Sequence, residues 1–398
     1  MKEPFMGGKD ADGPAVEGGP IGLAQGDDGA FPEAEALHGA EEPPDFAVAA
    51  GRENGEKDNR APGFDVFLLA DVSECVRRWR LDRRKRSCRL AVAAAGETRG
   101  EGPEPKECAM DRTDAGRREN RSVMGAIVGD IAGSRFEWRN CKSKHFPLMQ
   151  NRDEASHPCC FTDDTVMTVA VADAILNWKG SGQESFAVLS AEAQKSLLAF
   201  GHAYPRVGYG GSFRRWLLSG HPRPYHSWGN GAAMRVSACG WAGRTLEEAK
   251  AMSRAVTEIT HDHPEGIKGA EATAVATFLA RTGGTREEIR AVVLRDYYPM
   301  DFTLDAIRPA YAFDVSCQGS VPQALEAFFE SASFEDAIRN AISIGGDSDT
   351  LAAIAGAVAG AYYGIPDAIR AKAETFLDGN LRHVILRFER AFCENSVF

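Results

Sequence analysis

The sequence predicts an all-α protein, and three observations support this fold class. From Ser122 onward, successive windows carry apolar residues at helix spacing and are separated by Gly, Pro or Asp turns. The same region has no sustained run of alternating β-branched residues and no Asn-Gly hairpin between such runs. Two windows are apolar nearly all round, which predicts central, buried helices. The windows are residues 163–178, 184–200, 245–260, 267–282, 285–295, 321–330, 333–342, 348–363 and 366–376.

A change in composition divides the chain into a predicted extension and one helical domain. Residues 1–63 are rich in Gly, Pro, Ala, Asp and Glu, which is typical of disorder. We predict that residues 1–121 form the extension and residues 122–398 the domain. The basic run at 76–89 could serve nucleic-acid binding or nuclear targeting, but a solvated segment in a disordered tail is the favoured interpretation. A further hypothesis is that the native protein starts at Met124.

Length, charge and cysteine usage narrow the class of protein. The 398 residues are 43% hydrophobic and 26% charged, with a net charge of −11, which argues against a general nucleic-acid binder. The N-terminus shows no signal-peptide pattern, and the apolar stretch 351–363 is shorter than the ~20 residues of a membrane span. Nine cysteines without a C-x-x-C pair predict reduced thiols and a cytoplasmic location.

Two acidic motifs, far apart in the sequence, each open one of the apolar helices. Thr162-Asp163-Asp164-Thr165 precedes the first helix, and Asp347-Ser348-Asp349-Thr350 precedes the second. Thr162 and Ser348 are candidate caps, and acids in a first turn suit the helix dipole. For one motif alone, that structural explanation would suffice.

Together, the two motifs predict a metal site. Burying four carboxylates together at the starts of two core helices would cost much free energy unless a cation neutralises their charge. Aspartate and threonine oxygens are hard ligands, which suit Mg²⁺ or Mn²⁺ rather than zinc. Four aspartates and two threonines are more than one ion needs, which suggests a two-metal hydrolytic centre.

A third acidic element is GAIVGDIAGSRFEW, residues 125–138. Glycines at 125, 129 and 133 would let this helix approach a neighbour closely. Asp130 and Glu137 are seven residues apart and share a helical face if the helix extends that far. We expect Asp130 to be a buried hydrogen-bond partner and Glu137 to be the catalytic candidate.

Two glycine-rich loops and a histidine pair complete the candidate site. The loops 204–216 and 226–237 offer backbone N–H groups that could hold phosphates or a ribose. In THDHPEG, His261 and His263 are two residues apart, which suits capping or substrate contact better than metal ligation. No G-x-G-x-x-G after a strand and no G-K-[ST] motif is present.

The ordered set GAIVGDIAG…E, TDDT, GNGAAMR, TH and GGDSDT resembles the ADP-ribosylglycohydrolase family across about residues 124–398. This resemblance implies an orthogonal multi-helix bundle, two Mg²⁺ ions (with Mn²⁺ as the alternative) and hydrolysis at the distal ribose of ADP-ribose. The substrate would be an ADP-ribosylated protein or a small-molecule conjugate with an N- or O-glycosyl bond. No membrane partner is expected.

Site residues follow from the same resemblance. The implied metal ligands are Thr162, Asp163, Asp164, Asp347, Asp349 and Thr350, with Asp347 as the candidate bridge between the ions. Glu137, Asp163 and Asp347 are the implied catalytic residues. The implied substrate-binding residues are Ser227, Gly229, Asn230, Gly231, Ala232, Met234 and His261.

The sequence departs from the family pattern at the expected position of the general base. Two functions other than hydrolysis of ADP-ribose linkages also stay open. Some branches carry an aspartate in the loop corresponding to 204–211, but residues 201–224 contain no carboxylate here, which favours Glu137 or a metal-bound water as the base. Acids around two ions would also serve a phosphoesterase. A catalytically silent, crystallin-like relative is the third interpretation, disfavoured because all six ligand positions are kept.

Overall fold

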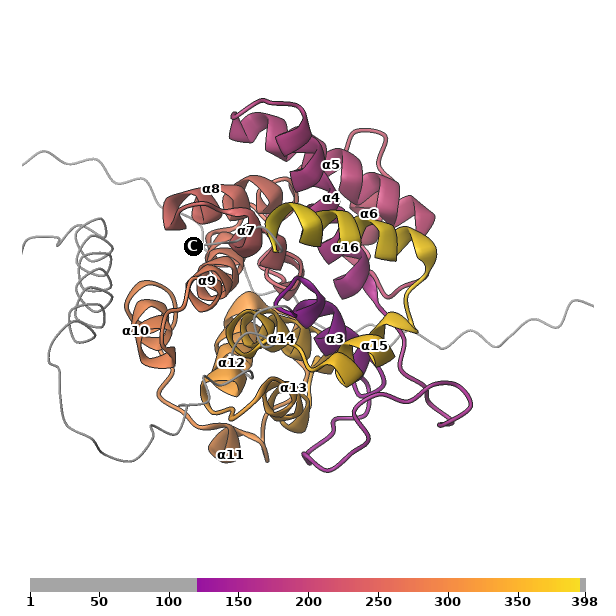
Figure 1. Ribbon diagram of the computed structural model, residues 1–398, viewed down its shortest axis with the longest axis vertical. Helices are drawn as coiled ribbons and strands as arrows, with labels where there is room; N and C mark the ends of the chain where they lie inside the picture. The colour runs from indigo at the N-terminus through magenta and orange to yellow at the C-terminus, as the bar shows by residue number, and fades with distance from the viewer. Residues whose placement is uncertain (1–119, 394–398) are drawn as a thin grey trace, which may run out of the picture. The chain divides into compact units, whose positions relative to one another are not determined.

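A computed structural model describes residues 120–393 of the chain, and within that range it is a bundle of helices (Figure 1). β pairing among the described residues is limited to one isolated antiparallel bridge between Gly229 and Ser316. The predicted all-α class is therefore confirmed, whereas the predicted disorder of the N-terminal extension falls outside the described residues. The elements are α3 (Met124–Gly133), α4 (Asp163–Gly180), α5 (Phe186–Ala203), α6 (Gly211–Leu217), η1 (Asn230–Ala232), α7 (Ser237–Ala242), α8 (Leu246–Thr257), α9 (Pro264–Arg281), α10 (Arg286–Asp296), α11 (Leu304–Ile307), α12 (Cys317–Phe329), α13 (Phe334–Ser343), α14 (Ser348–Tyr363), α15 (Asp367–Glu374) and α16 (Gly379–Phe392).

The centre of the bundle is the contact between α3 and α14, which lie side by side in Figure 1. Glycines face each other across it: a Cβ added to Gly125 would lie 2.3 Å from the carbonyl oxygen of Gly356, and one added to Gly129 would lie 1.9 Å from that of Ala352. The predicted close approach of these helices is confirmed. Helix α14 is buried along nearly its whole length, which explains why it has apolar side chains on all sides and no polar face.

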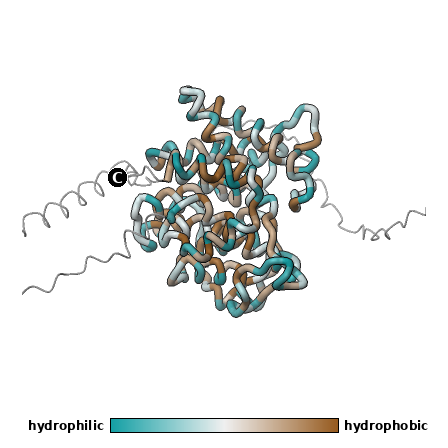
Figure 2. Tube along the Cα trace, turned by 45° about the vertical axis from the view of Figure 1, so that its right-hand side comes forward, coloured by the Kyte–Doolittle hydropathy of each residue, from teal (hydrophilic) through white to brown (hydrophobic). Residues whose placement is uncertain are grey.

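The remaining helices surround this pair in two crossing sets. In Figure 1, α9, α12 and α14 are seen nearly end on, whereas α5 and α16 run across the view. Helix α4 packs against α5 and α16, and α14 packs against α12 and α13. Hydrophobic residues concentrate in the interior and hydrophilic ones at the margin (Figure 2). Among the described residues, no helix combines the length and the hydropathy of a membrane span.

The helix starts show how local sequence sets the element boundaries. Thr162 begins α4 with its side-chain oxygen accepting from the backbone N–H of Asp164, and Thr285 forms a capping box with Glu288 at α10. The expectation that Ser348 caps α14 is wrong. Asp347 occupies the N-cap position without a side-chain capping bond, and the Ser348 hydroxyl donates to the carbonyl of Gly346 at 3.2 Å.

The folded domain includes residues before Met124. Val123 is buried, the hydroxyl of Ser122 accepts a hydrogen bond from the backbone N–H of Met124, and the carbonyl of Asn120 accepts from the N–H of Ile365. The bond between Asn120 and Ile365 attaches the start of the described chain to the loop between α14 and α15.

Candidate metal and active site

The two acidic motifs converge at the N-terminal ends of α4 and α14. Carboxylate oxygens of Glu137, Asp347 and Asp349 all lie within 4.8 Å of one another. The hydroxyl of Thr350 donates to Asp164 at 3.3 Å, which links the second motif to the first. The structure thus brings together residues that are nearly two hundred positions apart in the sequence.

Asp130 holds the first turn of α4 against α3. Its carboxylate accepts from the backbone N–H groups of Thr162 and Thr165, at 2.9 and 3.0 Å, and from the hydroxyls of both threonines. Burial raises the pKa of Asp130 to about 6, while these hydrogen bonds act in the opposite direction. The expectation that Asp130 is a buried hydrogen-bond partner is confirmed.

The acids of both motifs are buried or half-buried, and their pKa values show the cost of confining negative charge. Removal from water, reinforced by neighbouring carboxylates, raises the pKa of Asp163 to about 8 and the pKa values of Asp164 and Asp349 well above the ordinary range. Burial also raises the pKa of Asp347. Such a cluster is stable only if protons or a cation neutralise it.

The donor set fits a hard divalent cation. Asp164 is buried, and its Oδ1 atom has no hydrogen-bond partner within the described part of the chain, although an unpaired carboxylate oxygen in this setting costs free energy. All available ligand atoms are carboxylate or hydroxyl oxygens, which favours Mg²⁺ or Mn²⁺. The orphaned oxygen therefore supports the predicted metal site.

Glu137 reaches the cluster from outside a helix. Helix α3 ends at Gly133, so Asp130 and Glu137 do not share one helical face. The carboxyl group of Glu137 is half-buried, and burial followed by repulsion from Asp347 and Asp130 raises its pKa to about 7. A carboxyl group with this pKa can both take up and release a proton near neutral pH.

Two consecutive glycines form the turn that leads into the second motif. Gly345 and Gly346 both have a φ of 74°, a left-handed conformation that costs other residues free energy. This turn follows the end of α13 and places Asp347 at the start of α14. The glycines of GGDSDT are thus explained by backbone conformation.

The loop before α7 meets the acidic cluster through Asn230. The Asn230 side-chain amide donates to Asp347 at 2.7 Å and to the Ser320 hydroxyl at 3.1 Å. The Met234 sulfur lies 4.0 Å from the Thr350 hydroxyl. Sequence reasoning assigned Asn230 to the substrate and missed its contact with Asp347. The amide would fix the orientation of a candidate metal ligand.

His261 lies beside the same loop. A Cβ added at either Gly229 or Gly231 would be 3.5 Å from its Nε2 atom, so the imidazole borders the glycine-rich stretch. Ser227 supports this stretch by accepting from the N–H of Gly229 at 3.1 Å, whereas Ala232 is fully buried. The positions of Gly229, Gly231 and His261 suit the predicted substrate-binding role, which stays a prediction.

A buried chain of hydrogen bonds orients His261. Arg235 donates to the Thr260 hydroxyl at 2.6 Å, and this hydroxyl is 2.7 Å from Nδ1 of His261. Burial and the nearby Arg235 guanidinium hold the pKa of His261 well below its usual range, so the ring is neutral at pH 7. His263 caps α9 by accepting from the N–H of Glu265, as a capping role requires.

The loop before α6 covers Asp163 from the other side. The N–H of Asp163 donates to the carbonyl of Val207 at 2.8 Å, and a Cβ on Gly208 would lie 3.2 Å from the Asp163 carboxylate. The Tyr209 hydroxyl is buried with no hydrogen-bond partner among the described residues, and burial and Asp163 raise its pKa. Sequence reasoning searched this loop for carboxylates and so missed Tyr209.

The chain is similar in sequence to known proteins of one family. A family model described as ADP-ribosylglycohydrolase matches residues 112–395. ADP-ribosylhydrolase ARH3 of Bos taurus is 25% identical over 313 residues, covering 61% of this chain and 84% of that protein. ADP-ribosylarginine hydrolase Tri1 of Pseudomonas putida (strain GB-1) is 25% identical over 286 residues, covering 65% and 74%.

A solved structure shares the fold. It is titled "ADP-ribosylglycohydrolase-related protein complex" and superimposes with a TM-score of 0.50 at 23% sequence identity. The match covers 68% of this chain and 98% of the solved one.

Proposed function

Since the chain belongs to the ADP-ribosylglycohydrolase family and is an ADP-ribosyl glycohydrolase, we propose that it cleaves, in an Mg²⁺-dependent reaction, the glycosidic bond between ADP-ribose and an acceptor. The reaction would reverse ADP-ribosylation of a protein or a small molecule. The observation that carries this proposal is the convergence of Glu137, Asp347 and Asp349 beside the unpartnered carboxylate oxygen of Asp164.

The proposed metal ligands come from both motifs: Thr162, Asp163, Asp164, Asp347, Asp349 and Thr350. Two Mg²⁺ ions, or Mn²⁺ in their place, would neutralise these acids and polarise oxygens of the distal ribose. Asn230 would orient Asp347 through its 2.7 Å hydrogen bond.

The chain's own residues would then support bond cleavage. Glycosidic bonds break through an oxocarbenium-like state, which nearby carboxylates stabilise electrostatically. The Glu137 carboxylate is the proposed proton carrier, because its pKa of about 7 lets it change protonation near neutral pH.

The substrate's phosphates and ribose would lie along the loop that includes Ser227, Gly229, Asn230, Gly231, Ala232 and Met234. Backbone N–H groups of such a loop bind phosphate without a basic cluster. A neutral His261 beside Gly229 and Gly231 would add a hydrogen-bonding group at Nε2.

The proposed catalytic domain comprises residues 122–398, with residues 1–121 as an extension. A cytoplasmic location is the proposed compartment, and the absence of disulfides among the described cysteines supports reducing conditions. For the acceptor, an arginine linkage is the first to test, because the similar Tri1 protein is named an ADP-ribosylarginine hydrolase.

Product analysis tests this proposal. Arginine-linked and serine-linked ADP-ribosyl peptides are incubated with the full chain in Mg²⁺, in Mn²⁺ and in EDTA, with p-nitrophenyl phosphate as the comparison substrate. We expect free ADP-ribose from at least one peptide, no release in EDTA and no phosphatase activity. Phosphate release with intact peptides would point to a phosphoesterase, and release unaffected by EDTA would contradict the metal-dependent reaction.

A further inference from the structure

Glu137 belongs to a long connection without regular secondary structure. Helix α3 ends at Gly133 and α4 begins at Asp163, and no helix or strand forms between them. A side chain on such a connection is positioned only by the contacts that fix its backbone. Turn hydrogen bonds from Phe136 to Gly133 and from Arg139 to Phe136 hold the start of the connection. The residues directly after Glu137, 138–146, make further contacts with other parts of the fold and are called the strap below.

The first contact of the strap is an aromatic pair. Trp138 stacks on Phe313 with ring centroids 4.8 Å apart and an interplanar angle of 22°. The two side chains are exposed, at 77% and 42%, so neither ring is held by the hydrophobic core. The stacking therefore ties the residue next to Glu137 to the loop between α11 and α12.

The second set of contacts attaches the strap to the turn before Asp347. Asn140, itself at a φ of 48°, accepts from the N–H of Gly346 at 3.2 Å. A Cβ on Gly345 would lie 2.1 Å from the Asn140 side-chain oxygen, so Asn140 can approach the turn this closely only because residue 345 is a glycine. The Lys142 ammonium donates to the carbonyls of Ile344 and Tyr311, which joins both loops.

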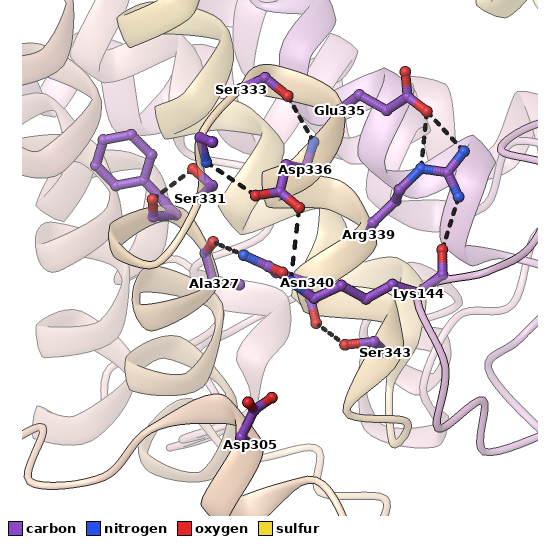
Figure 3. A network of polar contacts seen from close by, with 12 residues as sticks. Lys144, Asp305, Ala327, Ser331, Ser333, Glu335, Asp336, Arg339, Asn340 and Ser343 are labelled. Carbon is purple, nitrogen blue, oxygen red and sulfur yellow. Dashed lines mark hydrogen bonds and ion pairs between the residues drawn. The ribbon is translucent and has the colours of Figure 1, made fainter.

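The third set of contacts reaches α13, and those that involve Lys144 are drawn in Figure 3. Arg339 donates to the carbonyls of Lys144 and Phe146 at 2.9 and 2.7 Å, and it also pairs with Glu335 on its own helix. The Lys144 ammonium lies 3.6 Å from the Asp336 carboxylate. Because α13 leads directly into the Gly345–Gly346 turn, the strap and the second acidic motif rest on one support.

We propose that the strap is a positioning element that sets the distance between Glu137 and the Asp347–Asp349 pair. Trp138, Asn140 and Lys142 are its positioning residues, and Phe313 is the partner of the first. This role rests on the proposed function, which assigns proton transfer to Glu137. Displacement of a catalytic group by about 1 Å can lower a rate by about a hundredfold.

The test compares Phe313→Ala with two matched variants. Phe313→Tyr keeps an aromatic ring for stacking, and Leu386→Ala removes a side chain of similar exposure, 46%, on the remote helix α16. With the ADP-ribosyl peptide that the wild type cleaves, we expect kcat to fall about tenfold in Phe313→Ala, with KM within about twofold and an unchanged melting temperature. Phe313→Tyr and Leu386→Ala should keep the wild-type kcat.

A double variant separates stacking from independent effects. Trp138→Ala should lower kcat as Phe313→Ala does, and the combined variant should be no slower than either, since both remove the same contact. Limited trypsin digestion of the same proteins should cut faster after Arg139, Lys142 or Lys144 in Phe313→Ala than in Leu386→Ala.

Two failures can be told apart. A wild type that cleaves neither the arginine-linked nor the serine-linked peptide would overturn the proposed function and, with it, the role of the strap. The positioning role alone would be overturned if the wild type cleaves a peptide and any one of three results is obtained. These results are an unchanged kcat in Phe313→Ala, multiplicative losses of kcat in the double variant, and equal trypsin cleavage of Phe313→Ala and Leu386→Ala.

Discussion

The backbone N–H and the hydroxyl of Thr162 both donate to the carboxylate of Asp130, at 2.9 and 2.7 Å. With the equivalent pair from Thr165, these bonds make a residue of α3 the external cap of α4. Asp163 and Asp164 lie between the two threonines, so the same bonds fix the first turn that carries them.

Replacement of this cap should cost stability. Asp130→Ala leaves two buried N–H groups and two hydroxyls without their acceptor, and we expect the free energy of unfolding to fall by about 2–3 kcal/mol. Asp153→Ala, at an exposed position, is the control and should be neutral. Urea denaturation in EDTA measures both, and equal midpoints would contradict the capping role.

The contact between α3 and α14 makes a second prediction. Gly129→Ala would place a Cβ 1.9 Å from the Ala352 carbonyl oxygen, so the two helices must separate, and we expect a loss of about 3 kcal/mol or more. Gly180→Ala, at the end of α4 with no atom within 4 Å of the added Cβ, should be neutral or stabilising by up to about 1 kcal/mol. A Gly129→Ala protein as stable as Gly180→Ala would show that the helices can move apart freely.

The features that could be predicted from the sequence are those that a local pattern of residues encodes. The apolar run 348–363 coincides with α14 because a fully buried helix needs no polar face, and the paired acidic motifs identified the cluster through shared chemistry. Helix α16 was missed although Leu381, Val384, Ile385 and Phe388 carry the helical spacing and Asp378 caps it.

Other features had no local signal. Lys142 contacts Ile344 across 202 positions, and Asn230 contacts Asp347 across 117. Periodicity and spacing cannot reveal such pairs, because tertiary packing alone brings them together. Short, fully buried α7 likewise lacks the amphipathic pattern that marks a surface helix.

Loss of one acid from either motif should remove activity. Asp163→Ala and Asp347→Ala are expected to lower Mg²⁺-dependent ADP-ribose release by more than about a hundredfold, since each removes a proposed ligand. Asp301→Ala, exposed in the loop before α11, is the matched control. Release is followed chromatographically and Mn²⁺ binding by calorimetry; wild-type turnover in either variant would contradict the two-motif metal site.

The Asn230 amide gives a finer test of the same site. Asn230→Ala removes the 2.7 Å hydrogen bond that orients Asp347, and we expect Mn²⁺ affinity to fall about tenfold. Asn230→Asp replaces a donor by a second carboxylate at that distance and should lower kcat further through repulsion and misorientation. Calorimetry and kinetics on both variants decide this, and a fully active Asn230→Asp protein would argue against the orienting role.

The acidic cluster should make the metal-free protein less stable as pH rises. The pKa of Asp163 is raised to about 8, that of Glu137 to about 7, and those of Asp164 and Asp349 also lie well above their unfolded values. Between pH 6.5 and 8 the folded state therefore holds protons that the unfolded state has already lost, so the free energy of unfolding decreases with pH. His261, whose pKa is held low in the folded state, opposes this trend only in the lower part of the window, where unfolded imidazole with an ordinary pKa of about 6.5 is still partly protonated. We expect the melting temperature in EDTA to fall by several degrees across this window, and saturating Mg²⁺ to reduce the fall by taking the place of the protons.

Asp349→Asn should show a shallower slope of melting temperature against pH in EDTA than the Asp301→Asn control. A melting temperature that rises from pH 6.5 to 8 without metal would mean that these carboxylates are not confined together in the folded protein.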